Sequence, residues 1–269
     1  MGSSNLTLVE MNVYPVKGIA GHRPQQIRAE YSGLALDRHW LATDPDGMAL
    51  TQRDTPGLAR IRALPTSRGL QLTAPGNPGL MLAYDMPAGE SLDVQVWDDR
   101  IRAPRESADT EAWFSTVLGR DCRVVRMAGE ARRVTAVDHW PEAQPFGFAD
   151  GYPYLLMSQA SLDELSARVG FRLERERFRA NLWINGETPW AEDHWGRIRI
   201  GECVFQRVKP CARCKVTTLD PRTLEPGPEP LRALAGYRRG ADGGVLAGQN
   251  LICLVPGELR IGDSVIPEA

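Results

Sequence analysis

Residues 209–221 read Lys-Pro-Cys-Ala-Arg-Cys-Lys-Val-Thr-Thr-Leu-Asp-Pro, and they carry the most informative pattern in the chain. Two thiols, Cys211 and Cys214, stand two residues apart. Arg213 and Lys215 lie beside them, so the pair belongs to a basic stretch. Cations close to a cysteine favour its thiolate, the form that binds metals and attacks electrophiles. The stretch therefore predicts a chemically active site.

The bulk composition is that of an ordinary globular protein with two domains or one large one. The chain has 269 residues, of which 42% are hydrophobic and 25% are charged. Its formal net charge of −2 gives no electrostatic reason to expect a nucleic-acid partner. The longest apolar runs, such as residues 251–255, are far shorter than the roughly 20 residues of a membrane span. The N-terminus has no signal-peptide pattern, so we expect no membrane span and a cytoplasmic location.

The other three cysteines have a simpler interpretation. A total of five in a chain of this size does not indicate a disulfide framework. Cys122, Cys203 and Cys253 lie in strand-like runs beside Val, Ile, Leu and Phe. We expect these three to be buried structural thiols.

Short strands separated by turns dominate the pattern, as the many Gly and Pro residues suggest. The predicted strands are residues 6–13, 39–43, 48–53, 92–97, 100–103, 197–200, 203–208, 216–219, 250–255 and 258–261. The pairs 39–43 with 48–53, 92–97 with 100–103, and 197–200 with 203–208 are expected to form hairpins. The Pro- and Gly-rich residues 74–90 predict a long loop.

Three helices are expected. Ser107 can cap a helix that runs through residue 118 and ends at a glycine. Ser161 and Glu164 form a capping-box pattern that opens a helix to residue 169. Residues 230–239 are the third candidate. We place the domain boundary within 104–120, with an all-β part at 1–105 and an α+β part at 106–269.

The thiol pair admits several interpretations. A thioredoxin-like site needs a helix after the first thiol, but the β-branched residues 216–218 and the following Asp-Pro do not favour one. A structural zinc needs four ligands, and the chain offers no second thiol pair and four isolated histidines, His22, His39, His139 and His194. An ordinary loop also remains possible. The remaining interpretation is a reactive thiolate that binds a soft metal, with cations holding an anionic cofactor beside it.

The same stretch resembles the molybdenum-cofactor segment of MOSC-domain proteins, in particular the mitochondrial amidoxime-reducing components and their bacterial relatives. Other stretches agree in the order of that family. They are Tyr-Pro-Val-Lys-Gly at 14–18, Gly-Leu-Ala-Leu-Asp-Arg-His-Trp at 33–40, Arg-Phe-Arg-Ala-Asn at 177–181, Gly-Gln-Asn at 248–250 and Ile-Gly-Asp at 261–263. The resemblance covers nearly the whole chain. It implies a mainly β, or α+β, fold, with a MOSC β-barrel and a few helices, preceded by an N-terminal MOSC β-barrel domain.

The resemblance also implies a set of site residues. Cys214 matches the cysteine that ligates molybdenum, and it would tune the metal without attacking substrate. The positions that match cofactor contacts are Lys17, Arg38, Ser158, Arg179, Asn181, Arg213 and Asn250. The family often has a Ser where Gly18 stands and an aromatic residue where Asn250 stands. Lys17, Arg38 and Arg179 could neutralise the phosphate of the pterin, each through charge-assisted hydrogen bonds of roughly 1.5–3 kcal/mol.

The implied activity is the reduction of N-hydroxylated compounds, such as hydroxylamines and amidoximes, to amines or amidines by a molybdenum cofactor that cycles between Mo(VI) and Mo(IV). A separate ferredoxin-, flavin- or cytochrome b5-type protein would supply the electrons, since the chain has no cysteine cluster for an iron–sulfur centre. The sequence identifies no general acid, and Asp220 and the histidines are merely candidates for the proton donor. Two alternatives stay open. One is a sulfur carrier or cofactor-handling protein that acts through a cysteine persulfide, in which Cys211 could take part, and the other is a cofactor-binding module without turnover.

Overall fold

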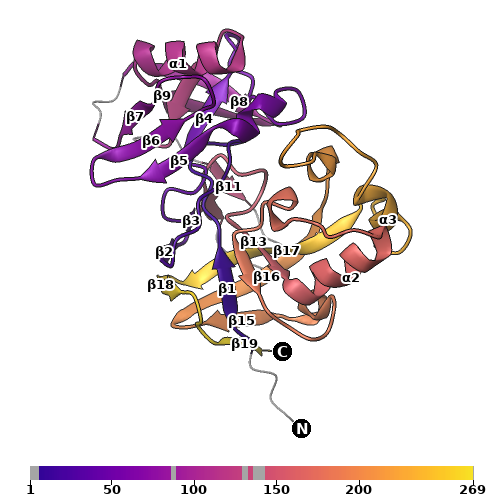
Figure 1. Ribbon diagram of the computed structural model, residues 1–269. Coiled ribbons are helices and arrows are strands. Elements are labelled where there is room, and N and C mark those ends of the chain that lie inside the picture. Colours follow the sequence, from indigo (N-terminus) through magenta and orange to yellow (C-terminus); the bar gives the residue numbers. More distant parts are fainter. Residues whose placement is uncertain (1–5, 86–88, 129–132, 136–142, 269) are drawn as a thin grey trace.

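Strands make up most of the computed structural model, which describes residues 6–85, 89–128, 133–135 and 143–268. Within these ranges the strands gather into two units, with three α-helices on their surfaces (Figure 1). The fold is therefore mainly β with a few helices, as the sequence predicts.

The lower unit in Figure 1 is built on a seven-stranded sheet. Its order is β1 (Leu8–Met11), β14 (Leu182–Ile184), β13 (Tyr154–Ser158), β17 (Leu246–Val255), β16 (Cys203–Ala212), β15 (Arg197–Ile200) and β19 (Val265–Glu268). The two outer strands approach each other again, because the amide of Val265 donates to the carbonyl of Leu6 at 2.8 Å and Thr7 forms a bridge with Ser264. The sheet thereby curls into an almost closed barrel, which protects its edges from further pairing.

Apolar side chains fill the barrel and its outer face. Inside, the rings of Tyr154 and Phe205 pack edge to face with centroids 5.0 Å apart. Outside, Leu162, Leu165 and Leu234 belong to a second buried cluster under the helices. The helical elements of this unit are α2 (Gln159–Val169), α3 (Leu231–Ala235) and the 3-10 turns η2 (Arg175–Arg177), η3 (Ala191–His194) and η4 (Lys215–Thr218).

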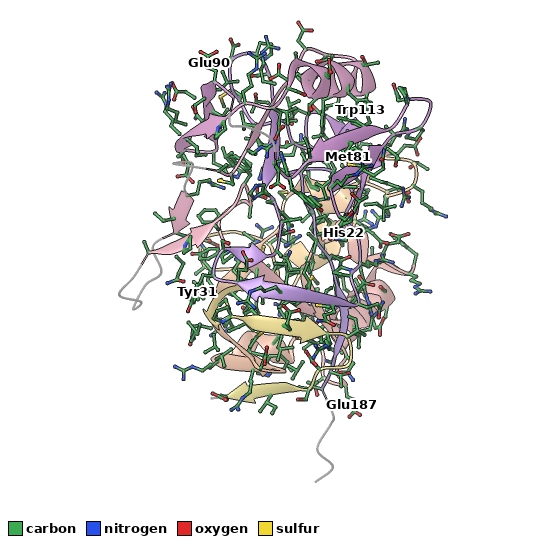
Figure 2. All side chains as sticks on the ribbon, turned by 90° about the vertical axis from the view of Figure 1, so that its left-hand side faces the viewer. His22, Tyr31, Met81, Glu90, Trp113 and Glu187 are labelled. Atoms are coloured by element: carbon green, nitrogen blue, oxygen red, sulfur yellow. The ribbon has the colours of Figure 1, made fainter. Side chains whose placement is uncertain are left out.

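The upper unit combines small antiparallel sheets with one helix. They are β4 (Trp40–Thr43) with β10 (Arg123–Arg126), then β5 (Arg62–Pro65), β6 (Gly69–Thr73) and β7 (Leu80–Ala83), and β8 (Ser91–Val96) with β9 (Asp99–Pro104), beside η1 (Pro56–Arg60) and α1 (Ala108–Leu118). Trp113 and Phe114 of α1 pack into the core of this unit. Figure 2 shows Trp113 in this unit, His22 between the two units and Glu187 at the far end of the lower one.

The first residues of the chain belong to the lower unit and also reach the upper one, where Val16 forms a bridge with Trp40. Strand β1 pairs with β14, and β2 (Gln26–Glu30) pairs with both β3 (Gly33–Leu34) and the late strand β18 (Gly257–Arg260). A further small pair is β11 (Arg133–Thr135) with β12 (Gln144–Phe146). Because the opening strands pair with strands of the second half, the predicted division at 105 does not separate the sheets, and it remains a prediction.

Several sequence predictions are confirmed in detail. Helix α1 begins after Ser107, whose side chain accepts from the amide of Thr110, and ends at Gly119 in the left-handed conformation. The hairpins β8–β9 and β15–β16 form with the predicted partners. The three cysteines expected to be structural are all buried, with at most 1% of their surface exposed.

The prediction of a strand at 216–219 is wrong, because these residues form the turn η4. The amide of Thr217 donates to the carbonyl of Cys214 at 3.1 Å. The hydroxyls of Thr217 and Thr218 also donate to carbonyls three residues earlier, at 3.0 and 2.8 Å. Such local bonds from threonine compete with a strand, and here they outweigh its β propensity.

Other boundaries need correction. Helix α2 is capped by Ser158 and not by Ser161, because the Ser161 hydroxyl is engaged by Glu192 at 2.8 Å. The third helix is shorter than 230–239, and the expected loop at 74–90 contains β7. The predicted strand 48–53 also fails, because the chain turns at Thr51, whose carbonyl accepts from the amide of Thr55 at 2.8 Å.

No helix among the described residues is long and apolar enough to cross a membrane. The described side chains also include no cluster of three or more His, Cys, Asp or Glu that could hold a metal ion by itself.

Candidate functional site

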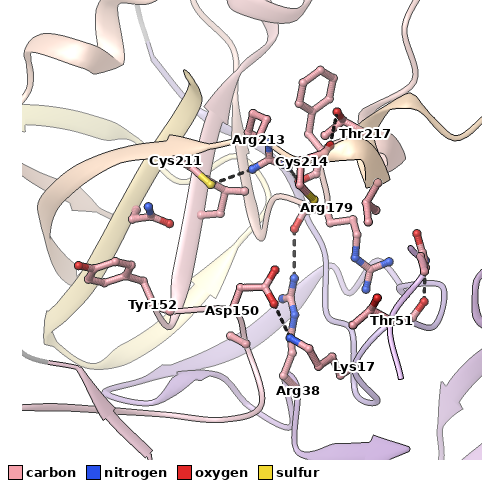
Figure 3. Close-up of a pocket in the computed structure, with 18 of the residues that line it drawn as sticks. Lys17, Arg38, Thr51, Asp150, Tyr152, Arg179, Cys211, Arg213, Cys214 and Thr217 are labelled. Carbon is pink, nitrogen blue, oxygen red and sulfur yellow. Dashed lines mark hydrogen bonds and ion pairs between the residues drawn. The ribbon is translucent and has the colours of Figure 1, made fainter. Parts of the chain in front are cut away.

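A pocket between the two units collects most of the predicted site residues (Figure 3). Its space is about 860 Å³, including the open mouth. The lining residues that matter below are Lys17, Arg38, Arg53, Asp150, Tyr152, Arg179, Asn181, Cys211, Arg213, Cys214 and Asn250. Seven of the eight predicted site residues are in this set, and Ser158 is not.

The thiols stand where β16 gives way to η4. Strand β16 runs through Cys211, and the amide of Arg213 still donates to Val245 O at 2.7 Å. Cys214 then takes the first position before η4. The Cys211 sulfur accepts from Arg213 Nη1 at 2.9 Å, whereas the Cys214 sulfur accepts from Arg53 Nη2 at 3.1 Å. Each thiol therefore has its own guanidinium, and Cys214 is the one contacted from the upper unit.

Arg213 is held firmly yet keeps one donor free. Its Nη2 donates to the carbonyl of Phe178 at 2.5 Å, and its guanidinium lies over the Phe178 ring. Its Nε is buried without a hydrogen-bond partner among the described residues. A buried unpaired N–H is costly, so this group is suited to an anionic or carbonyl ligand.

Lys17 is a buried residue of the N-terminal part of the chain that lines the pocket. Only 7% of its surface is exposed, and Nζ donates to Phe148 O at 2.9 Å and to Asp150 Oδ1 at 2.5 Å. Burial lowers the pKa of Lys17, an effect that Asp150 partly offsets. Although burial raises the pKa of Asp150, the neighbouring Lys17 ammonium holds it well below its usual value. Asp150 is therefore ionised near neutral pH.

Arg38 and Arg179 stack on Tyr14, each with its Cζ 4.2 Å from the ring centroid. Both arginines have left-handed backbones, with φ of 49° and 53°. Such conformations are uncommon for arginine and concentrate at functional sites. Arg38 is held by an ion pair with Asp37 and donates to the Arg179 carbonyl at 3.2 Å. A side chain at Gly147 would lie 2.5 Å from the Arg38 carbonyl, so only glycine allows this close approach.

Burial and the neighbouring Arg38 charge both act on the ionisation of Arg179. Burial lowers the pKa of Arg179 to about 10, and Arg38 acts in the same direction. Burial also raises the pKa of Tyr14 to about 12, so its ring stays neutral between the two cations. Two like charges held this close favour an anion between or beside them.

The two predicted asparagines differ. Asn181 is buried, and its amide donates to Asp37 Oδ2 at 3.0 Å and to Asn12 O at 3.2 Å, so it fixes the carboxylate that holds Arg38. Asn250 makes one long contact, 3.5 Å from its Nδ2 to Pro210 O, and is freer to turn toward a ligand.

Ser158 lies outside the pocket. It is 2% exposed, caps α2 and donates to Glu192 at 3.0 and 3.1 Å.

Sequence reasoning missed Arg53 and Asp150. Arg53 lies two residues after the turn at Thr51, which directs it from the upper unit toward Cys214. Because the sequence predicted a continuous strand at 48–53, it gave no indication of this turn. Asp150 had no motif around it, and only the contact with Lys17 reveals its place.

The residues considered as proton donors lie elsewhere. Asp220 accepts from the amides of Arg222 and Thr223 in its own turn. His39 packs on Trp40, and His194 belongs to η3. His22 lines a neighbouring cleft, and His139 is outside the described residues.

Charge and donor type together define what this pocket can bind. Among its described lining residues, five are cations, Lys17, Arg38, Arg53, Arg179 and Arg213, and one, Asp150, is a carboxylate. This excess of positive charge fits an anionic ligand, and a thiol beside a guanidinium fits a soft metal. The residues present thus fit a cofactor that combines an anionic group with a soft metal.

Comparisons with known proteins identify the family of the chain. The family described as the MOSC N-terminal beta barrel domain matches residues 5–121, and the family described as the MOSC domain matches residues 143–266. The chain is 31% identical over 278 residues to mitochondrial amidoxime-reducing component 1 of Mus musculus, covering 96% of this chain and 81% of that protein. The human protein of the same name is 28% identical over 276 residues, with 96% and 82% covered.

The chain also matches a longer curated protein and, weakly, a solved structure. The molybdenum cofactor sulfurase of Danio rerio is 29% identical over 290 residues, which is 98% of this chain but only 34% of that protein. The YuaD protein from Bacillus subtilis has a solved structure with a TM-score of 0.45 and 12% identity, covering 97% of this chain and 94% of that one. On the family matches and the mouse relative, the chain belongs to the MOSC-domain proteins that carry an N-terminal MOSC beta barrel domain.

Proposed function

We propose that this protein is a molybdenum-cofactor-dependent reductase of N-hydroxylated compounds, with Cys214 as the protein ligand of the metal. One observation supports this most strongly. The Cys214 thiol and five cations from both units line the same pocket. The amidoxime-reducing components are among the relatives that match along nearly the whole chain.

The residues divide the work of holding the cofactor. Cys214 would bind the metal, and Arg53, whose Nη2 donates to the Cys214 sulfur at 3.1 Å, would hold that side chain at the pocket. Lys17, Arg38 and Arg179 would neutralise the phosphate, and the free Nε of Arg213 would donate to the pterin or its phosphate. When bound, the cofactor supplies the two-electron chemistry, while the protein supplies position and electrostatics.

Replacing an N–OH bond by N–H and releasing water consumes two electrons and two protons. Asp150 is ionised by its contact with Lys17 and has no proton to give near neutral pH. Lys17, Tyr152 and Cys211 are among the described titratable side chains that line the pocket and would be available to pass a proton. The electrons would come from a ferredoxin-, flavin- or cytochrome b5-type protein, in a cytoplasmic setting.

The test starts with elemental analysis of the protein as isolated. We expect about one molybdenum per chain, lost in Cys214→Ala and kept in the matched control Cys211→Ala. Purified holoprotein should reduce an amidoxime with an artificial donor such as reduced methyl viologen, and Cys214→Ser should abolish this activity without unfolding the chain.

Other results would replace the proposal. A persulfide on a metal-free chain would indicate a sulfur carrier, the alternative that the sulfurase relatives keep open. Bound metal without any reduction of hydroxylamines or amidoximes would indicate a binding module. Full molybdenum and full turnover in Cys214→Ser would show that another group is the ligand.

A further inference from the structure

A second hollow adjoins the Cys214 pocket on the side of the upper unit. Its lining includes Met48, Val96 and Trp97, and it shares Lys17, Thr51 and Arg53 with the pocket. Its space is about 780 Å³, including the open mouth. Because three residues belong to both, a molecule at Cys214 can extend into this hollow.

Exposed apolar side chains line one part of the hollow, beside the charged residues Lys17, Arg53, Asp54 and Asp98. Trp97 is 47% exposed and Met48 is 44% exposed. Two loops hold them together, since the amide of Ala49 donates to Gln95 O at 3.0 Å and the amide of Gln95 donates to Gly47 O at 2.8 Å. Large apolar side chains that gather on a surface beside a pocket commonly mark a binding site.

Trp97 is fixed in place despite its exposure. Its indole N–H donates to Asp150 at 3.1 Å, and the Arg53 guanidinium lies 4.4 Å from its ring centroid. Its backbone is left-handed, with φ of 57°, which is strained for a bulky residue. The same Arg53 contacts the Cys214 sulfur, so one guanidinium separates the indole from the thiol.

We infer that Trp97 and Met48 form the binding surface for a flat apolar group of the substrate, so that the protein prefers aromatic over short aliphatic N-hydroxylated compounds. This inference rests on the proposed function. The aromatic group packs on the indole and the thioether, and the N–OH group extends past Arg53 to Cys214. Aromatic and sulfur contacts of this type favour ring-bearing ligands.

The experiment compares two amidoximes that differ only in the apolar group, benzamidoxime with a phenyl ring and acetamidoxime with a methyl group. Met48→Ala should raise the KM of the holoprotein for benzamidoxime by roughly five- to tenfold, as expected from the loss of a few buried methylene groups. The KM for acetamidoxime should stay within about twofold. Phe171→Ala, which removes an equally exposed aromatic residue (47%) outside these pockets, should change neither.

Substitutions of Trp97 separate its ring from its hydrogen bond. Trp97→Phe keeps an aromatic face but loses the N–H to Asp150, and it should retain most of the preference for benzamidoxime. Trp97→Ala should lose that preference. The inference would be overturned if Met48→Ala changed the KM for both substrates equally. It would also be overturned if Trp97→Phe lost the preference for benzamidoxime over acetamidoxime as completely as Trp97→Ala.

Equilibrium binding distinguishes this inference from the proposed function. Calorimetry with benzamidoxime and oxidised holoprotein, without an electron donor, measures affinity without turnover. Tight binding that weakens in Met48→Ala supports the subsite even if no reduction occurs, in which case only the reductase proposal fails. Binding that does not depend on Met48 and Trp97 refutes the subsite even in an active reductase.

Discussion

Two groups of buried cations show how the same chemistry can be structural in one place and functional in another. In the upper unit, Arg126 donates to Glu106 through Nε at 2.5 Å and Nη2 at 2.8 Å, and to Tyr84 O through Nη1 at 2.9 Å. Glu106 also accepts from the indole of Trp40 at 2.8 Å. One cation meets one carboxylate, and both side chains are almost completely buried.

The pocket between the units has no such balance. Lys17, Arg38 and Arg179 lie close together, with Asp37 and Asp150 as their partners, while the Nε of Arg213 has no partner among the described residues. The comparison shows that burial alone does not identify a binding cation. What distinguishes the pocket is uncompensated positive charge and unused donors, which an anionic ligand can satisfy.

The largest effect should come from opening the balanced pair. Glu106→Gln leaves the Arg126 charge buried without its carboxylate, and breaking such a pair costs about 3–5 kcal/mol of unfolding free energy. Chemical denaturation of the metal-free protein measures this. The matched control Asp93→Asn opens an exposed pair with Arg102, whose atoms are 3.6 Å apart, and should cost less than about 1 kcal/mol. A similar loss in both variants would remove the distinction.

Lys17→Met should weaken cofactor binding but leave the stability of the fold nearly unchanged, the reverse of Glu106→Gln. Loss of one charge-assisted contact should weaken cofactor binding by about 10- to 100-fold, equivalent to roughly 1.5–3 kcal/mol. The unfolding free energy of the metal-free protein should change by less than about 1 kcal/mol, because burial already disfavours the charged form of Lys17 and Asp150 keeps its hydrogen bond from the Trp97 indole. Molybdenum content after dialysis measures occupancy. Lys215→Met, an exposed lysine next to Cys214, is the control and should keep its metal.

The sequence could predict the site residues that stand in contiguous motifs, but not those whose roles depend on contacts between distant parts of the chain. Lys17, Arg38 and Cys214 stand in contiguous motifs, and the structure brings all three into one pocket. Arg53 and Asp150 could not be found, because their roles depend on a turn and on a contact between residues far apart in the chain. The strand predicted at 216–219 failed because threonine hydroxyls bond to the local backbone, a choice that β propensity does not register.

Ser158 tests whether a motif match outweighs geometry. Ser158→Ala removes the cap of α2 and a hydrogen bond to Glu192, which is fully buried, and should lower the unfolding free energy by about 2 kcal/mol. The molybdenum content of the folded protein should not change, because Ser158 does not line the pocket. A loss of metal with unchanged stability would restore the original prediction that this residue contacts the cofactor.

The smallest effect concerns His39, which lies beside the balanced pair and reports on its charge. Burial, assisted by the nearby Arg126 cation, lowers the pKa of His39 from 6.5 to about 4. The unfolded chain therefore binds this proton first as the pH falls, so the stability that His39 contributes is present above about pH 6.5 and is lost between about 6.5 and 4. Between pH 7 and pH 5 the loss should be about 1 kcal/mol after allowing for partial exposure of the ring. His39→Gln should remove this part of the pH dependence, measured by urea unfolding at both pH values. An unchanged difference would mean that the Arg126 charge is already fully balanced by Glu106 and that the ring is better hydrated than its packing on Trp40 indicates.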